Sequence, residues 1–372
     1  MSPSDAGARL RSLDAFRGLT VAAMIFVNNP GTWRHVYPTL RHAEWNGCTV
    51  ADLVFPFFLF IVGVAITFSF ATAEGRREPR AQQLPKLVRR TLIIFALGLF
   101  LNGFPFFTIE SWRIPGVLQR IALCYGLAAL AALLLTMRGQ AIAAGALLLG
   151  YWGLIRWVPI PGYGAGQLQR TANLPAYIDE LVLRGHMFRA HWDPEGILST
   201  VPAVATTLGG VLTGHWLRSP RGQLERVVGL FVAGNFAVVL GLVMNAWLPI
   251  NKDLWTSSYA VFTGGVALNL LALCYWLIEV QGCVRWAVPF FVLGTNPILA
   301  YLLPSLLDRV MITTHVTRAD GSIVLLKTYV FETCFLPWAS RAHASVLYAT
   351  ADVLMWMAIL SILYRRRIFI KI

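Results

Sequence analysis

Charged residues are scarce in this chain: they make up 13% of its 372 residues, whereas hydrophobic residues make up 57%. With a mean hydropathy of +0.62, this composition excludes an ordinary water-soluble domain and indicates a polytopic membrane protein. The net charge of +13 comes from short basic clusters between apolar runs, not from one basic face. That distribution is typical of membrane topology, so we predict no nucleic-acid partner.

The sequence motifs of several common enzyme classes are also missing. There is no GxSxG, no Walker loop and no GxGxxG placed after a strand, so hydrolase, nucleotidase and dinucleotide-binding interpretations lose their usual support. The five cysteines form no CxxC pair, and the seven histidines form no HExxH, so we predict no metal site. No internal repeat is visible, which disfavours the commonest transporter architectures.

Apolar runs of about 20 residues, long enough to cross a bilayer, recur along the whole chain. They predict an all-α, polytopic bundle of about ten transmembrane helices. The expected ranges are 13–30, 52–73, 88–106, 115–137, 139–158, 196–217, 227–248, 255–278, 286–307 and 343–364. We expect residues 1–372 to form a single membrane domain, with short amphipathic helices in the long segments 159–195 and 308–342.

Basic residues concentrate in alternate connecting segments, which sets the expected orientation. Two of these clusters hold Arg76, Arg77, Lys86, Arg89 and Arg90, and Arg365, Arg366, Arg367 and Lys371. The positive-inside rule then places both termini in the cytoplasm and the sparser, longer segments outside. No basic region is followed by a short apolar stretch and a cleavage site, so we expect the first helix to be retained.

The most informative polar stretch is RHAEWNGCTVAD, which ends where a long apolar run begins. It puts His42 just outside the mouth of a predicted membrane helix, with Asp52 in the first turn of that helix. Histidine is the side chain best suited to move protons at neutral pH, and a nearby carboxylate can orient it. We therefore expect His42 to act as a base supported by Asp52.

Other polar groups lie at similar depth on neighbouring predicted helix ends, which suggests one shared outer cavity. They are Gln119, Arg120, Glu195, Asn251 and Lys252. Asp193 in WDPEG is expected to cap a helix that starts there. Asn296 lies within a span beside a proline, where it either satisfies a freed carbonyl or lines a cavity.

Six segments of the chain, taken in order, resemble the heparan-alpha-glucosaminide N-acetyltransferase family of transmembrane acyltransferases. They are LDAFRGLTVAAMIFVNN, RHAEWNGCTVADLVFPFFLFIVG, RIPGVLQRIALCY, DPEGILST, NKDLWTSSY and LGTNPILAY. The resemblance implies transfer of an acetyl group from acetyl-CoA to the amino group of a glucosamine across the membrane. The sequence carries no counterpart of the large N-terminal lumenal domain of the lysosomal members, so we expect a bacterial-type member in the inner (cytoplasmic) membrane.

The resemblance also implies roles for individual residues. It makes His42 the catalytic histidine and Asn28 the functional asparagine, beside Asp52. Arg17, Arg89 and Arg90 are the expected contacts of coenzyme A. The acceptor sugar is expected to meet Glu44, Trp45, Asn46, Gln119, Arg120, Glu195, Asn251, Lys252 and Asn296. The resemblance further implies a homodimer surrounded by membrane lipid. An amino-sugar transporter with the same outer cavity is the alternative interpretation, and the acceptor group, amine or hydroxyl, stays open.

Overall fold

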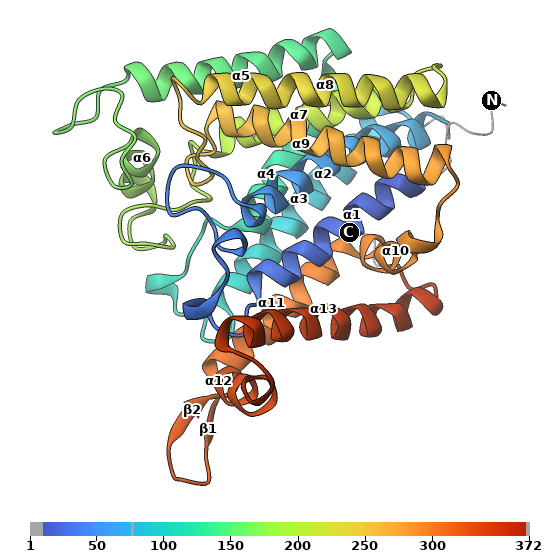
Figure 1. The fold of residues 1–372 in the computed structure, drawn as a ribbon. Coiled ribbons are helices and arrows are strands. Elements are labelled where there is room, and N and C mark those ends of the chain that lie inside the picture. The colour runs from blue at the N-terminus through green and yellow to red at the C-terminus, as the bar shows by residue number, and fades with distance from the viewer. Residues whose placement is uncertain (1–9, 76–77, 370–372) are drawn as a thin grey trace.

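The computed structural model describes residues 10–75 and 78–369. Its long helices lie side by side, with α6 and the segment between α1 and α2 at one end of the bundle (Figure 1). The helices up to α9 are α1 (Arg11–Asn28), α2 (Val50–Gly75), α3 (Arg80–Gly103), α4 (Val117–Leu134), α5 (Met137–Trp157), α6 (Leu174–Leu183), α7 (Thr200–Leu217), α8 (Gln223–Met244) and α9 (Ser257–Tyr275). The remaining elements are α10 (Val288–Thr295), α11 (Pro297–Thr313), strands β1 (His315–Thr317) and β2 (Ile323–Leu325), α12 (Leu326–Val330) and α13 (Arg341–Arg365).

The predicted all-α class and polytopic membrane character are confirmed. Among the described residues, five helices are long and apolar enough to cross a membrane, namely α2, α4, α8, α9 with its π-helical extension to Val280, and α13. The pair α10 and α11 makes a sixth candidate, bent by 73° at Asn296 and Pro297. Each predicted range coincides with a helix or with this bent pair, but α1, α3, α5 and α7 are not among the candidate spans. Charged residues near one end of α1 and α3 and at both ends of α5, and the small polar residues of α7, lower the apolarity of those helices.

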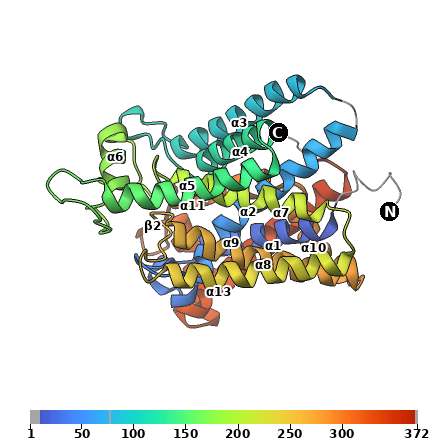
Figure 2. The ribbon, with the colours of Figure 1, turned by 90° about the horizontal axis from the view of Figure 1, so that it is seen from above.

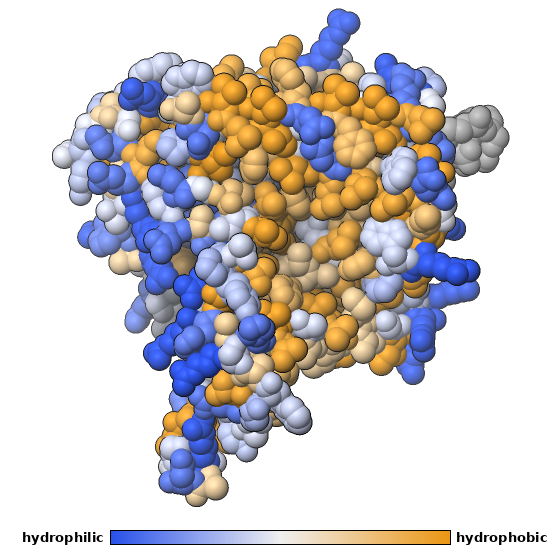
Figure 3. Space-filling model, in the orientation of Figure 1, coloured by the Kyte–Doolittle hydropathy of each residue, from blue (hydrophilic) through white to orange (hydrophobic). Residues whose placement is uncertain are grey.

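An apolar belt between two polar ends fits this membrane character. In Figure 3 hydrophobic residues cover most of the visible face, and hydrophilic residues gather toward its left and right margins. Arg76, Arg77 and Lys371, on which the predicted orientation partly rests, lie outside the described residues. The structure therefore supports a membrane-embedded body, while the sidedness of its two ends stays a prediction.

Helix α2 is the centre of the bundle. Buried positions make up 67% of its most apolar stretch, against 22% for α8 and α13, which lie at the periphery. Figure 2 shows α2 and α7 between α3 and α4 on one side and α8 and α13 on the other. Glycines allow α2 and α7 to touch: a Cβ on Gly63 would lie 1.9 Å from the Thr207 carbonyl oxygen, and one on Gly210 2.0 Å from that of Phe60. Such small-residue contacts are characteristic of membrane helix packing.

The connecting segments contain both expected and unexpected structure. The helix expected within LPAYIDELVLRG is present as α6, capped by the Asn173 side chain, which accepts the Ala176 N–H. The hairpin β1–β2 was not predicted, and it projects from the bundle beside α12 (Figure 1). The prediction that Asp193 caps a helix is wrong, because α7 begins only at Thr200 and Asp193 is held by an arginine instead.

Candidate active site

A cavity of about 540 Å³, here called the chamber, opens at the end of the bundle that carries α6. Its apolar wall comes from α1, α2 and α4, through side chains such as Met24, Val54 and Phe55. Its polar wall comes from the C-terminal residue of α1, Asn28, and from connecting segments that contribute His42, Glu44, Glu195, Lys252 and Asp253. The chamber is therefore apolar toward the bundle and polar toward its mouth, which is the character of a small-molecule site.

His42 is held by Asp52, the third residue of α2. The Nδ1 atom of His42 lies 2.8 Å from Oδ1 of the fully buried Asp52 carboxylate. The other oxygen, Oδ2, accepts the backbone N–H groups of Ala43 and Thr49 and the Thr49 hydroxyl, each at 3.0 Å. Because a carboxylate can only accept, Nδ1 carries the proton in this contact, and Nε2 is left as the basic nitrogen.

Lys252 reaches the same histidine from the segment that precedes α9. Its Nζ lies 3.0 Å from Nδ1 and 3.3 Å from Nε2 of His42, and 3.6 Å from Oδ1 of Asp52. A carboxylate and an ammonium thus flank one imidazole. With Nδ1 protonated, the Lys252 ammonium can donate only to Nε2 of His42. When His42 takes up a proton, Asp52 offsets the repulsion between the imidazolium and Lys252, and Lys252 lies near any anion that develops in the chamber.

Asn46 and Asn251, both predicted to bind substrate, instead join two segments together. Asn251 is fully buried, donates to Oδ1 of Asn46 at 3.2 Å and accepts the Leu254 N–H at 2.9 Å. The Gly47 N–H adds a bond to the Ile250 carbonyl at 2.7 Å. These contacts fix the segment that carries Lys252 against the segment that carries His42, so we interpret both asparagines as positioning residues.

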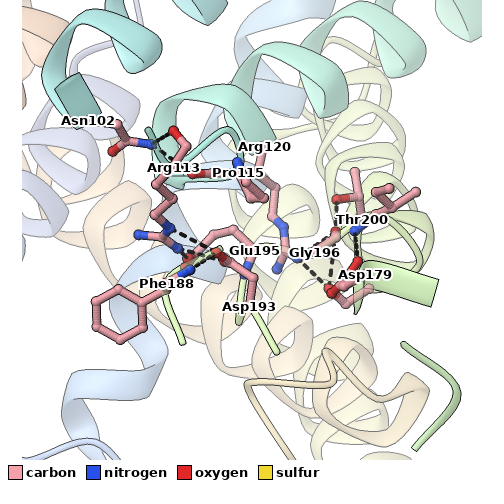
Figure 4. Close-up of polar contacts among 12 residues, drawn as sticks. Asn102, Arg113, Pro115, Arg120, Asp179, Phe188, Asp193, Glu195, Gly196 and Thr200 are labelled. Atoms are coloured by element: carbon pink, nitrogen blue, oxygen red, sulfur yellow. Dashed lines mark hydrogen bonds and ion pairs between the residues drawn. The ribbon is translucent and has the colours of Figure 1, made fainter. Parts of the chain in front are cut away.

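Arg113 organises the wall opposite, and sequence reasoning missed it. Its guanidinium donates to both oxygens of Asp193 at 2.8 and 2.6 Å and to Oε2 of Glu195 at 2.5 Å (Figure 4). Burial opposes its charge, but the two carboxylates outweigh burial and raise the pKa of Arg113. The missed signal is that Arg113 begins RIPGVLQRIALCY, a segment already quoted for the family resemblance. Glu195 lines the chamber, with its carboxylate bound to this arginine.

Gln119, Arg120 and Asn296 do not line the chamber. Arg120 is 1% exposed and donates to Oγ of Ser199 at 2.5 Å and to the Gly196 carbonyl at 3.2 Å (Figure 4). Its guanidinium also lies over the Trp255 ring. Gln119 is buried on the same helix turn, and Asn296 donates to the Ile368 carbonyl at 3.1 Å. The structure therefore gives no support to direct contact of these three residues with a substrate in the chamber.

An aromatic pair stands at the rim of the chamber. Trp192 lines the cavity and meets Trp45 edge to face, with ring centroids 6.1 Å apart. Arg170 lies over both rings and donates to the Glu44 carbonyl, and the Trp45 indole N–H donates to Leu168. Trp45, predicted to bind substrate, does not line the chamber itself but packs against Trp192, which does. Amphipathic rings of this kind are common partners of polar ligands.

The three predicted coenzyme A contacts lie near two further cavities. Arg89 and Arg90 line one of about 660 Å³ together with Lys86. Arg17 and Arg90 line another of about 290 Å³. Nε of Arg90 is buried and has no hydrogen-bond partner among the described residues, and its guanidinium lies over the Tyr125 ring at 4.7 Å. A basic, partly unsatisfied lining of this kind suits an anionic ligand.

One face of α2 lines all three cavities. Ala51, Val54 and Phe55 line the chamber, and Phe58, Val62 and Ala65 line the 290 Å³ cavity. Further along, Ser69 and Phe70 line both the 290 Å³ and the 660 Å³ cavities. These positions follow the three- and four-residue spacing of a single helix face. A mostly apolar stripe therefore runs from the His42 chamber to the basic cavities.

Comparisons with known proteins assign the chain to a family. The family model described as heparan-alpha-glucosaminide N-acetyltransferase, catalytic, matches residues 9–226, which include His42, Asp52 and Arg113. The human heparan-alpha-glucosaminide N-acetyltransferase is 30% identical over 98% of this chain, and the mouse protein is 29% identical over 98%. The chain spans 60% of the length of either relative. The chain belongs to the heparan-alpha-glucosaminide N-acetyltransferase catalytic family.

Proposed function

We propose that this protein is a membrane acetyltransferase that moves an acetyl group from cytoplasmic acetyl-CoA to the amino or hydroxyl group of a glucosamine-type sugar on the outer face. The observation that carries the proposal is the His42–Asp52 pair, 2.8 Å apart, in a chamber that the α2 stripe links to basic cavities. Family membership supports the reaction class. We place the protein in the bacterial inner membrane as one unit of ten spans, with both termini cytoplasmic.

Coenzyme A has the charge distribution that this arrangement suits. Its anionic nucleotide would be held by Arg89, Arg90 and Arg17, while its long pantetheine arm would follow the mostly apolar face of α2. The helix rises about 1.5 Å per residue, so the stretch from Ser69 to Asp52 spans about 25 Å. The thioester would then arrive in the chamber beside His42.

His42 is proposed to act as general base. Its Nε2 takes a proton from the attacking acceptor nitrogen, a bond forms to the acetyl carbon, and the carbon–sulfur bond breaks as the proton passes to sulfur. Asp52 stabilises the imidazolium, and Lys252 or Asn28 stabilises the oxyanion. General base catalysis typically supplies about 10²- to 10⁴-fold, and positioning in the chamber supplies much of the rest. Direct transfer and a transient acetyl-imidazole on His42 both satisfy this geometry, and only the latter gives ping-pong kinetics.

The test uses purified protein in sealed vesicles. Acetyl-CoA bearing a labelled acetyl group is supplied only inside, glucosamine only outside, and labelled N-acetylglucosamine is measured outside. Wild-type protein is expected to form external product, and His42→Ala protein to form almost none. Absence of transfer by folded wild-type protein, or near wild-type transfer by His42→Ala, would contradict the proposal. Cysteine labelling at position 42 and at the chain ends tests the orientation.

A carrier of amino sugars is the second candidate, because a series of cavities along one helix also suits passage of a solute. Acetyl transfer and sugar transport can be distinguished in detergent, where no gradient exists. Product formation that depends on acetyl-CoA supports the enzyme, whereas sugar counterflow in liposomes without acetylation supports the carrier. We also propose a homodimer, which light scattering of the detergent-solubilised protein would test.

A further inference from the structure

Asp253 is an acidic residue of the chamber that takes no part in the side-chain contacts described above. It lines the cavity next to Lys252, yet no hydrogen bond or ion pair joins its side chain to any residue that the structure describes. The other acidic groups differ: Asp52 is bound by His42 and Thr49, Glu195 is bound by Arg113, and Glu44 is exposed. The oxygens of Asp253 are not among the fully buried polar atoms, so the carboxylate is open to the cavity and free to accept a donor from a ligand there.

The surroundings of Asp253 keep it able to exchange a proton. Burial raises the pKa of Asp253 to about 6, and Glu195 and Asp52 act in the same direction. Lys252 and Arg170 act in the opposite direction. At neutral pH the group is therefore mostly ionised, and it becomes neutral as the pH falls through about 6.

The proton balance of acetyl transfer distinguishes the two classes of acceptor. A hydroxyl loses one proton on acylation, and that proton ends on the departing sulfur. An ammonium loses two: one before it can attack and one as the new carbon–nitrogen bond forms. The net reaction is R–NH₃⁺ plus acetyl–S–CoA giving R–NH–acetyl, HS–CoA and H⁺. An acceptor that binds as the ammonium must therefore give its first proton to a group other than His42, and a negative side chain would hold the incoming cation.

We propose that Asp253 binds the ammonium group of the acceptor, takes its first proton and so makes the chamber selective for amines over hydroxyls. Each of the two protons then has its own acceptor. Asp253 takes the first proton from the ammonium and passes it to water at the open mouth of the chamber. His42 takes the second proton and delivers it to the departing sulfur. The inference rests on the proposed acetyltransferase function and assigns the acceptor class of that same site. It places the specificity determinant outside the residues that the sequence pattern singled out.

The experiment compares glucosamine with glucose, which carries a hydroxyl in place of the amine. Binding of each sugar to the purified full chain is measured by calorimetry, and transfer from acetyl-CoA is measured in parallel. The variants are Asp253→Asn, Asp253→Glu and, as a matched control, Asp320→Asn, which changes an exposed aspartate at the turn between β1 and β2. Loss of a charge-assisted hydrogen bond predicts glucosamine binding weaker by about 10- to 100-fold in Asp253→Asn, with glucose binding unchanged. Asp253→Glu is expected to recover part of the loss, and Asp320→Asn to match wild type.

The pH dependence gives a readout that a merely structural role would not move. Glucosamine binding by wild type is expected to weaken as the pH falls from roughly 8 to roughly 5, and Asp253→Asn is expected to lose that dependence. Equal preference for glucosamine in wild type and Asp253→Asn would overturn the inference, as would wild-type protein that binds both sugars alike. If wild type binds glucosamine through Asp253 but transfers no acetyl group, the acetyltransferase proposal fails while the amine site stands.

Discussion

Replacement of Asp52 by asparagine is the sharpest test of how the active site is built. The Oδ2 atom of Asp52 accepts three donors from Ala43 and Thr49, so an amide nitrogen cannot occupy that position. The amide NH₂ of the substituted side chain would therefore face Nδ1 of His42, where Asp52 now presents Oδ1 at 2.8 Å. Since an NH₂ group only donates, His42 would have to accept at Nδ1 and carry its proton on Nε2.

This change of tautomer removes the base without removing the histidine. Nε2 would point a proton at the acceptor, and the carboxylate that stabilises the imidazolium would be gone. We expect kcat to fall by about 10³- to 10⁴-fold, as for a wrongly held catalytic histidine in other enzymes. The KM for acetyl-CoA should change little, because Arg89 and Arg90 lie at other cavities.

Steady-state rates with acetyl-CoA and glucosamine would measure the effect, with size-exclusion profiles confirming a folded protein. The double variant Asp52→Asn, His42→Ala should be no slower than His42→Ala alone, since both residues act as one unit. A folded Asp52→Asn protein that keeps kcat within about tenfold of wild type would refute the proposed orientation of His42.

Three further predictions concern the surrounding structure. Arg113→Ala would leave two acidic partners without their cation and should lower the unfolding free energy by about 3–5 kcal/mol, visible as a lower melting temperature; an unchanged melting temperature would contradict this. Gly196→Ala places a methyl group 1.8 Å from Oδ2 of Asp179 and should lower both stability and activity, whereas Gly209→Ala, with nothing within 4 Å, should behave as wild type. Arg89→Ala should raise the KM for acetyl-CoA by about 10-fold or more while the KM for the sugar stays constant. A KM for acetyl-CoA equal to that of wild type would show that Arg89 does not bind the nucleotide.

Much of the fold could be predicted because hydropathy acts locally. A run of apolar residues long enough to cross a bilayer must satisfy its own backbone, so it forms a helix wherever it lies in the chain. The predicted ranges accordingly coincide with helices. The late start of α7 could not be predicted, because Asp193 is bound by Arg113, 80 residues away in the chain. The hairpin β1–β2 was not predicted either.

The candidate site, like the fold, could be predicted from the sequence only in part. His42 and Asp52 are ten residues apart, so the sequence by itself determined their contact through the short segment that leads into α2. Only the tertiary structure decided that Lys252 and Asp253 join them and that Arg120 points away from the cavity. Depth along a helix can be counted from the sequence, but the direction in which a side chain points depends on which helices pack beside it, and that is set by contacts between residues far apart in the chain.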